Sequence, residues 1–111
     1  MTRIASADVD GVLRDLKQRN VTSIWTTISF VFPLLFESGE TLAVSNEILE
    51  PRYRVFPEGT LWREPKRDRE AAFVVETNAP IRPLVEMRCE QIFGSPPVVR
   101  EYGQLTVITN R

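Results

Sequence analysis

The sequence predicts a small three-layer α/β domain whose mixed sheet has a parallel core and a C-terminal antiparallel hairpin. Helical and β-rich stretches alternate along most of the chain, as they do in α/β domains. The stretch Val21–Ser45 reads as strand, helix and strand, and a crossover of this length joins parallel strands. The chain closes with two β-branched runs around Gly103-Gln104, which is typical of an antiparallel hairpin.

The composition fits a single domain over residues 1–111. Apolar residues make up 42% of the chain, and 14 basic against 15 acidic residues leave a formal charge of −1. This balance argues against a general nucleic-acid binder, which carries a clustered basic excess. The longest apolar run, Ile28–Phe36, is far short of the roughly 20 residues that span a bilayer, and the N-terminus lacks the apolar core of a secretory signal. We therefore expect a soluble chain, either whole or a piece of a larger protein.

The first predicted element is an amphipathic helix over Ser6–Arg19. Its apolar residues recur at the i, i+3, i+4, i+7 spacing of one helix face. Ser6 is a plausible N-cap, and Asn20 can adopt the left-handed conformation that ends a helix. The apolar face comprises Val9, Val12, Leu13 and Leu16.

The next stretch predicts a buried strand at Val21–Thr26, a helix at Ile28–Ser38 and a second strand at Thr41–Ser45. Its β-branched and aromatic content also allows one long strand over residues 21–32. We favour the helix because Gly39 lies where a C-terminal glycine stop belongs.

Residues 46–70 are irregular and rich in proline, with an edge strand conceivable at residues 52–56. The mixed-sign run REPKRDRE at residues 63–70 predicts a solvated loop; its mixed sign argues against a patch for phosphate or lipid head groups. A buried strand follows at Ala71–Glu76.

The remaining chain predicts a helix and the hairpin. Thr77 or Asn78 caps the helix, Ala79-Pro80-Ile81 opens it and Gly94 ends it. The hairpin strands are Val98–Tyr102 and Leu105–Thr109. The predicted apolar side of the helix comprises Ile81, Leu84, Val85, Cys89, Ile92 and Phe93.

No catalytic motif is present in the sequence. Histidine is absent, and Cys89 is the single cysteine, so neither an intrachain disulfide nor a thiolate zinc cluster can form. Cys89 lies on the apolar side of a predicted helix and lacks a histidine base, which favours a core residue over a nucleophile. We predict no catalytic residue, no metal site and no cofactor.

A candidate ligand site follows from topology. In open parallel α/β sheets, ligands bind beyond the carboxyl ends of the strands. Short polar residues follow all three predicted parallel strands there, as binding of an anion or a sugar hydroxyl at helix N-termini requires. The same residues are also ordinary helix N-caps, and that explanation stays open. The candidate ligand-binding residues are Thr26, Thr27, Asn46, Thr77 and Asn78.

The order of elements, together with the stretch FESGE at residues 36–40 and Tyr53 in the proline-rich loop, resembles the soluble C-terminal domain of multi-spanning membrane glycosyltransferases. These are the dolichyl-phosphate-mannose protein mannosyltransferases and the lipid A aminoarabinose transferases. Two departures stand out. The strand end that is typically rich in tyrosine and tryptophan is here Trp25-Thr26-Thr27, and Pro33 replaces an expected arginine.

The resemblance implies a non-catalytic accessory domain at the extracytoplasmic face of a membrane. Its partner would be the membrane domain of the same polypeptide, which takes sugar from a polyprenyl-phosphate donor. The alternative is a stand-alone cytosolic interaction or regulatory protein, which could form a homodimer through the C-terminal hairpin with Leu105–Thr109 as its exposed edge. A third reading is a small enzyme that uses the strand-end polar residues.

Overall fold

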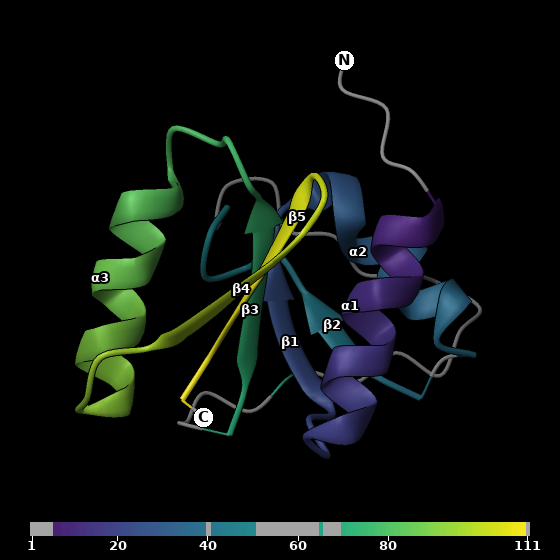
Figure 1. Ribbon diagram of the computed structural model, residues 1–111, viewed down its shortest axis with the longest axis horizontal. Coiled ribbons are helices and arrows are strands. Elements are labelled where there is room, and N and C mark those ends of the chain that lie inside the picture. The colour runs from purple at the N-terminus through teal and green to yellow at the C-terminus, as the bar shows by residue number, and fades with distance from the viewer. Residues whose placement is uncertain (1–5, 40, 51–64, 66–69, 111) are drawn as a thin grey trace.

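The computed structural model describes residues 6–39, 41–50, 65 and 70–110. Figure 1 shows a five-stranded sheet flanked by helices on both sides. The elements are α1 (Ser6–Gln18), β1 (Ser23–Thr26), α2 (Ile28–Glu37), β2 (Ala43–Ser45), β3 (Ala72–Glu76), α3 (Arg82–Phe93), β4 (Val98–Tyr102) and β5 (Leu105–Thr109).

The sheet has the strand order β2-β1-β3-β5-β4. Strand β1 pairs in parallel with β2 on one side and β3 on the other, whereas β5 pairs antiparallel with both β3 and β4. The predicted mixed sheet with a parallel core and a C-terminal antiparallel hairpin is therefore confirmed.

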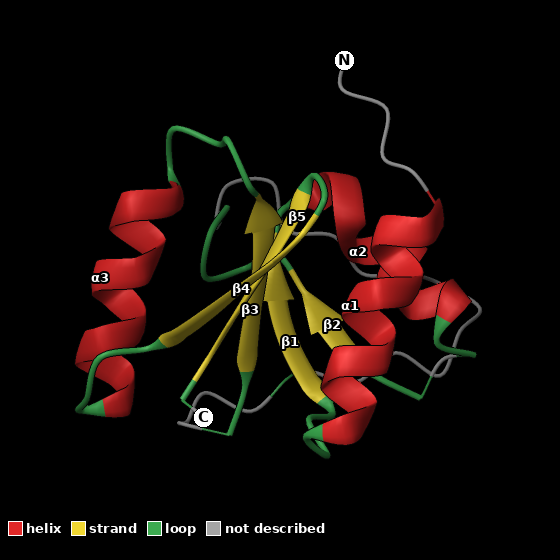
Figure 2. Ribbon diagram, in the orientation of Figure 1, coloured by secondary structure: helices red, strands yellow, loops and turns green. Residues whose placement is uncertain are grey.

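Each face of the sheet carries its own apolar core. The helices α1 and α2 pack on one face, and α3 covers β3 and β5 on the other, with the turn that follows β2 adding Ile48 and Leu49 (Figure 2). Trp25 and Phe73 are fully buried on the α3 side, while Leu16 and Leu34 are fully buried on the opposite side. Because both faces are covered, residues on both sides of the parallel strands are buried, polar residues such as Ser23, Thr26 and Ser45 included.

The first half of the chain folds as its local pattern predicts. Of the four apolar residues of α1, three are buried and the fourth packs against the core. Asn20 has a φ of 56° and Gly39 a φ of 66°, the left-handed geometry expected just beyond each helix. The competing single strand over residues 21–32 is wrong, because α2 occupies Ile28–Glu37 with Pro33 accommodated on its exposed side.

The start of α3 differs from the prediction. The helix begins at Arg82 with Ile81 at the N-cap position, so neither Thr77 nor Asn78 caps it. Pro83 lies in the first turn, where the missing backbone N–H would have had no intrahelical partner. Leu84, predicted on the apolar side, is 65% exposed.

The hairpin has the predicted strands, but their order corrects a second expectation. Strand β5 (Leu105–Thr109) lies between β3 and β4 and all five of its residues are buried, so it is not an exposed edge. Within the described sheet the edge on this side is β4. The edge strand conceivable at residues 52–56 and most of the charged run at 63–70 lie outside the described residues.

None of the helices in the described part of the chain is both long enough and apolar enough to cross a membrane.

Candidate functional site

The residues predicted from topology lie at or just beyond the carboxyl ends of the parallel strands, and the hydroxyl groups of two of them connect strands to neighbouring segments. The Thr26 hydroxyl is buried and donates to the carbonyl of Val74, 2.7 Å away. The Thr77 hydroxyl donates to the carbonyl of Gly103 at 2.9 Å. These bonds tie β1 to β3, and β3 to the hairpin turn.

The other three predicted residues behave differently from one another. Asn46 is fully buried and its amide donates to the carboxylate of Glu50 at 3.3 Å. Thr27 occupies the N-cap position of α2 without a side-chain capping bond. Asn78 is exposed. The structure therefore gathers the five residues at one edge of the sheet, and ligand binding by them stays a prediction.

The hairpin turn meets the N-terminal end of α1 at this same edge. A carboxylate oxygen of Asp8 accepts a hydrogen bond from the backbone N–H of Gln104 at 3.0 Å. Gly103 has a φ of 60°, and a side chain at this position would meet the Asp8 carboxylate. The close approach of Asp8 thus requires glycine in the turn for both steric and backbone reasons.

Sequence reasoning missed an ionic cluster in which Arg19, Arg100 and Tyr102 surround the buried Asp15. Arg100 donates from Nε and Nη2 to the two oxygens of Asp15, at 2.5 and 2.9 Å. Arg19 Nε donates to Oδ1 at 3.1 Å, and the Tyr102 hydroxyl donates to Oδ2. The cluster joins α1 to β4. Asp15 lies beside the apolar face of the helix and four residues before Arg19, but its other partners, Arg100 and Tyr102, lie 85 and 87 residues away in sequence.

The electrostatics of Asp15 follow from this geometry. Its side chain is 2% exposed, and burial acts to raise its pKa. The hydrogen bonds from Arg100 and Tyr102 and the positive charges of Arg100 and Arg19 outweigh burial, so the pKa of Asp15 is lowered. The hydrogen bond to Asp15, followed by burial, raises the pKa of Tyr102. Since a carboxylate has about four acceptor positions, Asp15 has no capacity left for a substrate.

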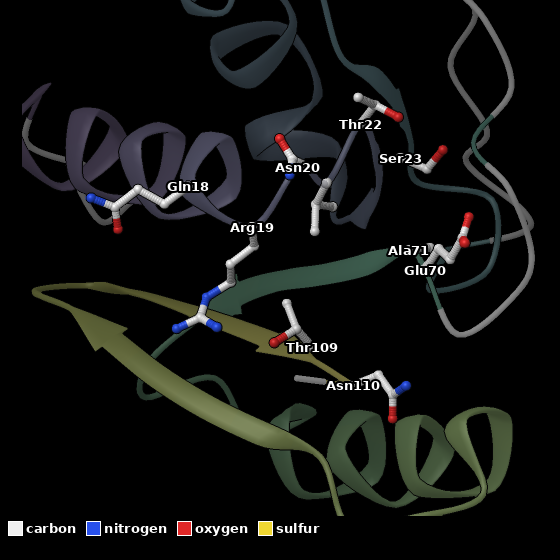
Figure 3. Close-up of a pocket in the computed structure, with 10 residues that line it drawn as sticks. Gln18, Arg19, Asn20, Thr22, Ser23, Glu70, Ala71, Thr109 and Asn110 are labelled. Atoms are coloured by element: carbon white, nitrogen blue, oxygen red, sulfur yellow. The ribbon is translucent and has the colours of Figure 1, made fainter.

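A cavity of about 620 Å³ opens at the amino ends of the parallel strands, across the sheet from the predicted residues at their carboxyl ends. The amino ends of the parallel strands β1 and β3 meet the carboxyl end of the antiparallel strand β5 there. Figure 3 shows the Arg19 side chain extending from the end of α1 toward the sheet. The lining residues are Gln18, Arg19, Asn20, Val21, Thr22, Ser23, Glu70, Ala71, Thr109 and Asn110.

The chemistry of this lining is polar and close to neutral. It offers three hydroxyl groups, three amide side chains, one guanidinium and one carboxylate. Its volume falls within the range of small-molecule sites. The ionic cluster supports one wall, because Thr109 accepts a hydrogen bond from Arg100 Nη2 at 3.0 Å and Arg19 belongs to both features. The cavity therefore suits binding of a polar molecule through hydrogen bonds.

The remaining reactive side chains do not form a chemical centre in the described part of the chain. Burial, and then the charge of Glu86, raises the pKa of the Cys89 thiol to about 12, so the residue stays protonated and packs in the core as predicted. Across residues 6–39, 41–50, 65 and 70–110, no three acidic, histidine or cysteine side chains are placed to hold a metal ion.

Comparison with known proteins identifies no relative: no family model, no curated protein and no solved structure matches this chain.

Proposed function

We propose that this chain is a non-catalytic accessory domain of a membrane glycosyltransferase-like protein that uses a polyprenyl-phosphate sugar donor. One observation supports the absence of a catalytic role: the hydrogen-bond acceptor positions of the Asp15 carboxylate are all used by Arg100, Arg19 and Tyr102. A buried carboxylate of this kind is an obvious candidate for a general base, and here it fastens a helix to a strand instead.

The placement in a glycosyltransferase-like protein rests on the resemblance in element order and on the segment that begins at Phe36. The described part of that segment, Phe36–Gly39, forms the end of α2 and its left-handed stop. Phe36 is 52% exposed there. The proposed role is contact with the membrane domain of the same polypeptide, at the extracytoplasmic face.

An antibody raised against the purified domain tests this proposal directly. Membrane and soluble fractions of the native cell are separated and probed by immunoblotting. We expect a band much larger than the 12.7 kDa of this chain, and only in the membrane fraction. A soluble band at 12.7 kDa would overturn the proposal and favour a stand-alone cytosolic protein.

The cavity favours one additional function, recognition of a small polar ligand. NMR titrations with methyl mannoside and with inorganic phosphate, run separately, would test it, with shifts expected at Ser23 and Thr109. The exposed Thr22 lines the cavity, so Thr22→Tyr should abolish those shifts, and Thr41→Tyr, at an exposed threonine elsewhere, should not. Shifts confined to the opposite edge, at Thr26 and Thr77, would locate the site where topology predicted it.

A further inference from the structure

The edge strand β4 presents hydrogen-bonding groups that its own sheet does not use. The backbone N–H of Thr77 donates to the carbonyl of Gln104 at 2.8 Å, so the even-numbered residues of β5 bond toward β3. In an antiparallel ladder the direction alternates along the strand, so the odd-numbered residues of β5 bond toward β4. Their partners are Val98, Arg100 and Tyr102. The N–H and C=O groups of Val99 and Glu101 therefore point away from the sheet.

Along Val98–Tyr102 the described structure has neither a proline nor a bulge; Pro96 and Pro97 lie just before the strand. Natural proteins protect edge strands with free charges, proline, bulges or a covering helix. Here both charged residues are neutralised within the molecule, Arg100 by Asp15 and Glu101 by Arg82 at 2.7 Å. These ion pairs lie on opposite faces of the sheet, because Asp15 belongs to α1 and Arg82 to α3. The strand also carries an exposed apolar side chain, Val98, at 38% exposure.

We infer that β4 is a self-association edge, at which two copies of this chain pair their β4 strands antiparallel about a two-fold axis at Arg100. In this register Val99 faces the partner's Glu101 and Glu101 faces the partner's Val99, so all four outward-pointing N–H groups find carbonyl acceptors. The two five-stranded sheets become one continuous sheet. This edge is separate from the cavity, and the pairing can form in an accessory domain and in a stand-alone protein alike.

Two neighbouring registers are less favourable. An axis at Glu101 would place two glutamates directly opposite each other, each 53% exposed and held by a single ion pair to its own Arg82, which is destabilising. An axis at Val99 would place Glu101 opposite the partner's Pro97, which has no N–H to donate. The axis at Arg100 brings the two guanidinium groups face to face, but each is held by two hydrogen bonds to its own Asp15.

The preferred register also matches apolar side chains. Val98, Arg100 and Tyr102 lie on the α1 face, since residues two apart share a face and both Arg100 and Tyr102 bond to Asp15. An axis at Arg100 sets Val98 opposite the partner's Tyr102, and the reciprocal contact repeats this pair. Pairs of an aromatic and a β-branched residue are among the stabilising cross-strand pairs. This contact would cover the exposed Val98.

Sedimentation equilibrium from about 10 µM to about 1 mM covers the range in which a weak interface is populated. We expect the mass to rise from 12.7 kDa toward twice that value. Val98→Lys places a charge against the partner's Tyr102 and should weaken association at least about tenfold. Leu84→Lys makes the same change at an exposed leucine of α3 and should leave association unchanged. Circular dichroism would check that both variants are folded.

Amide hydrogen exchange reports the register without a substitution. The amides of Val99 and Glu101 should exchange quickly in dilute protein and slow at least about tenfold in concentrated protein, in proportion to the fraction associated. A mass of 12.7 kDa throughout the range would overturn the inference. So would association that Val98→Lys leaves unchanged, or that occurs without protection of these two amides.

Discussion

Replacing Asp15 by asparagine removes the central charge of the ionic cluster while keeping the shape of the side chain. In the native protein the carboxylate accepts two hydrogen bonds from Arg100, one from Arg19 and one from Tyr102. Asparagine has one acceptor oxygen, and its amide nitrogen would face donors that it cannot satisfy. The substitution thus leaves Arg100, whose side chain is 17% exposed, without its counter-ion.

Removing one partner of a buried ion pair typically costs 3–5 kcal/mol, because the remaining charge is left buried and uncompensated, and we expect about 3–5 kcal/mol here. For a domain of this size each kcal/mol lowers the melting temperature by about 4 °C, so the loss should be roughly 12–20 °C. Arg100 Nη1 is already buried without a hydrogen-bond partner among the described residues, so the guanidinium has little capacity to find new ones.

Urea denaturation and thermal melting monitored by circular dichroism would measure the effect. Asp10→Asn changes an exposed aspartate of the same helix and should shift the free energy of unfolding by no more than about 0.5 kcal/mol. The double variant Asp15→Leu, Arg100→Met removes both charges and should be more stable than Asp15→Asn alone. A cost below about 1 kcal/mol for Asp15→Asn would refute the view that this cluster fastens α1 to β4.

Three further predictions concern the pH dependence of stability, the hairpin turn and the buried thiol. The lowered pKa of Asp15 contributes stability that is present above pH 3.8, its ordinary pKa, and is lost as the pH falls through the pKa of the folded state. The raised pKa of Tyr102 contributes stability that is present below pH 10.0, its ordinary pKa, and is lost as the pH rises through the pKa of the folded state. Urea midpoints should therefore be highest between these limits, and a profile that is flat on the acid side would contradict this. Gly103→Ala should cost about 1–3 kcal/mol in urea denaturation, because its Cβ would lie 2.6 Å from Cγ of Asp8 at a positive φ, and the cost should shrink in an Asp8→Ala background. The thiol of Cys89 should react with Ellman's reagent at pH 8 only as fast as the protein unfolds, so rapid reaction of the whole population in native protein would show that the side chain is accessible.

The elements of the fold could be predicted because local signals decide them. Four apolar residues at helical spacing, from Val9 to Leu16, define the buried face of α1. Glycines in the left-handed conformation, Gly39 and Gly94, define the ends of α2 and α3. The two-residue turn at Gly103 defines the hairpin register. Each signal involves only a few neighbouring residues, so it can be recognised from the sequence alone.

The start of α3 shows where local signals compete. Thr77 and Asn78 are good N-caps, and proline is expected in a first helical turn, so the sequence permits more than one helix start. In the structure Thr77 continues the β3 ladder through its N–H and bonds Gly103 through its hydroxyl. Because these bonds to the hairpin turn use the N–H and hydroxyl of Thr77, Thr77 does not cap the helix. The helix begins at Arg82 instead, with Pro83 in its first turn.

The sequence by itself determined the helices, the strands, the parallel unit around β1 and the hairpin, since each depends on periodicity or on a turn over a few residues. Only the tertiary structure decided that β5 enters the middle of the sheet and leaves β4 at its edge. That choice depends on which strand β3 accepts as a neighbour, a contact between residues about thirty apart in sequence. The same choice brings Arg100 and Tyr102 under Asp15 and places Thr109 beside Arg19 at the cavity. Strand order is a property of packing between distant segments, so the ionic cluster, the cavity and the open edge become visible only when the chain is folded.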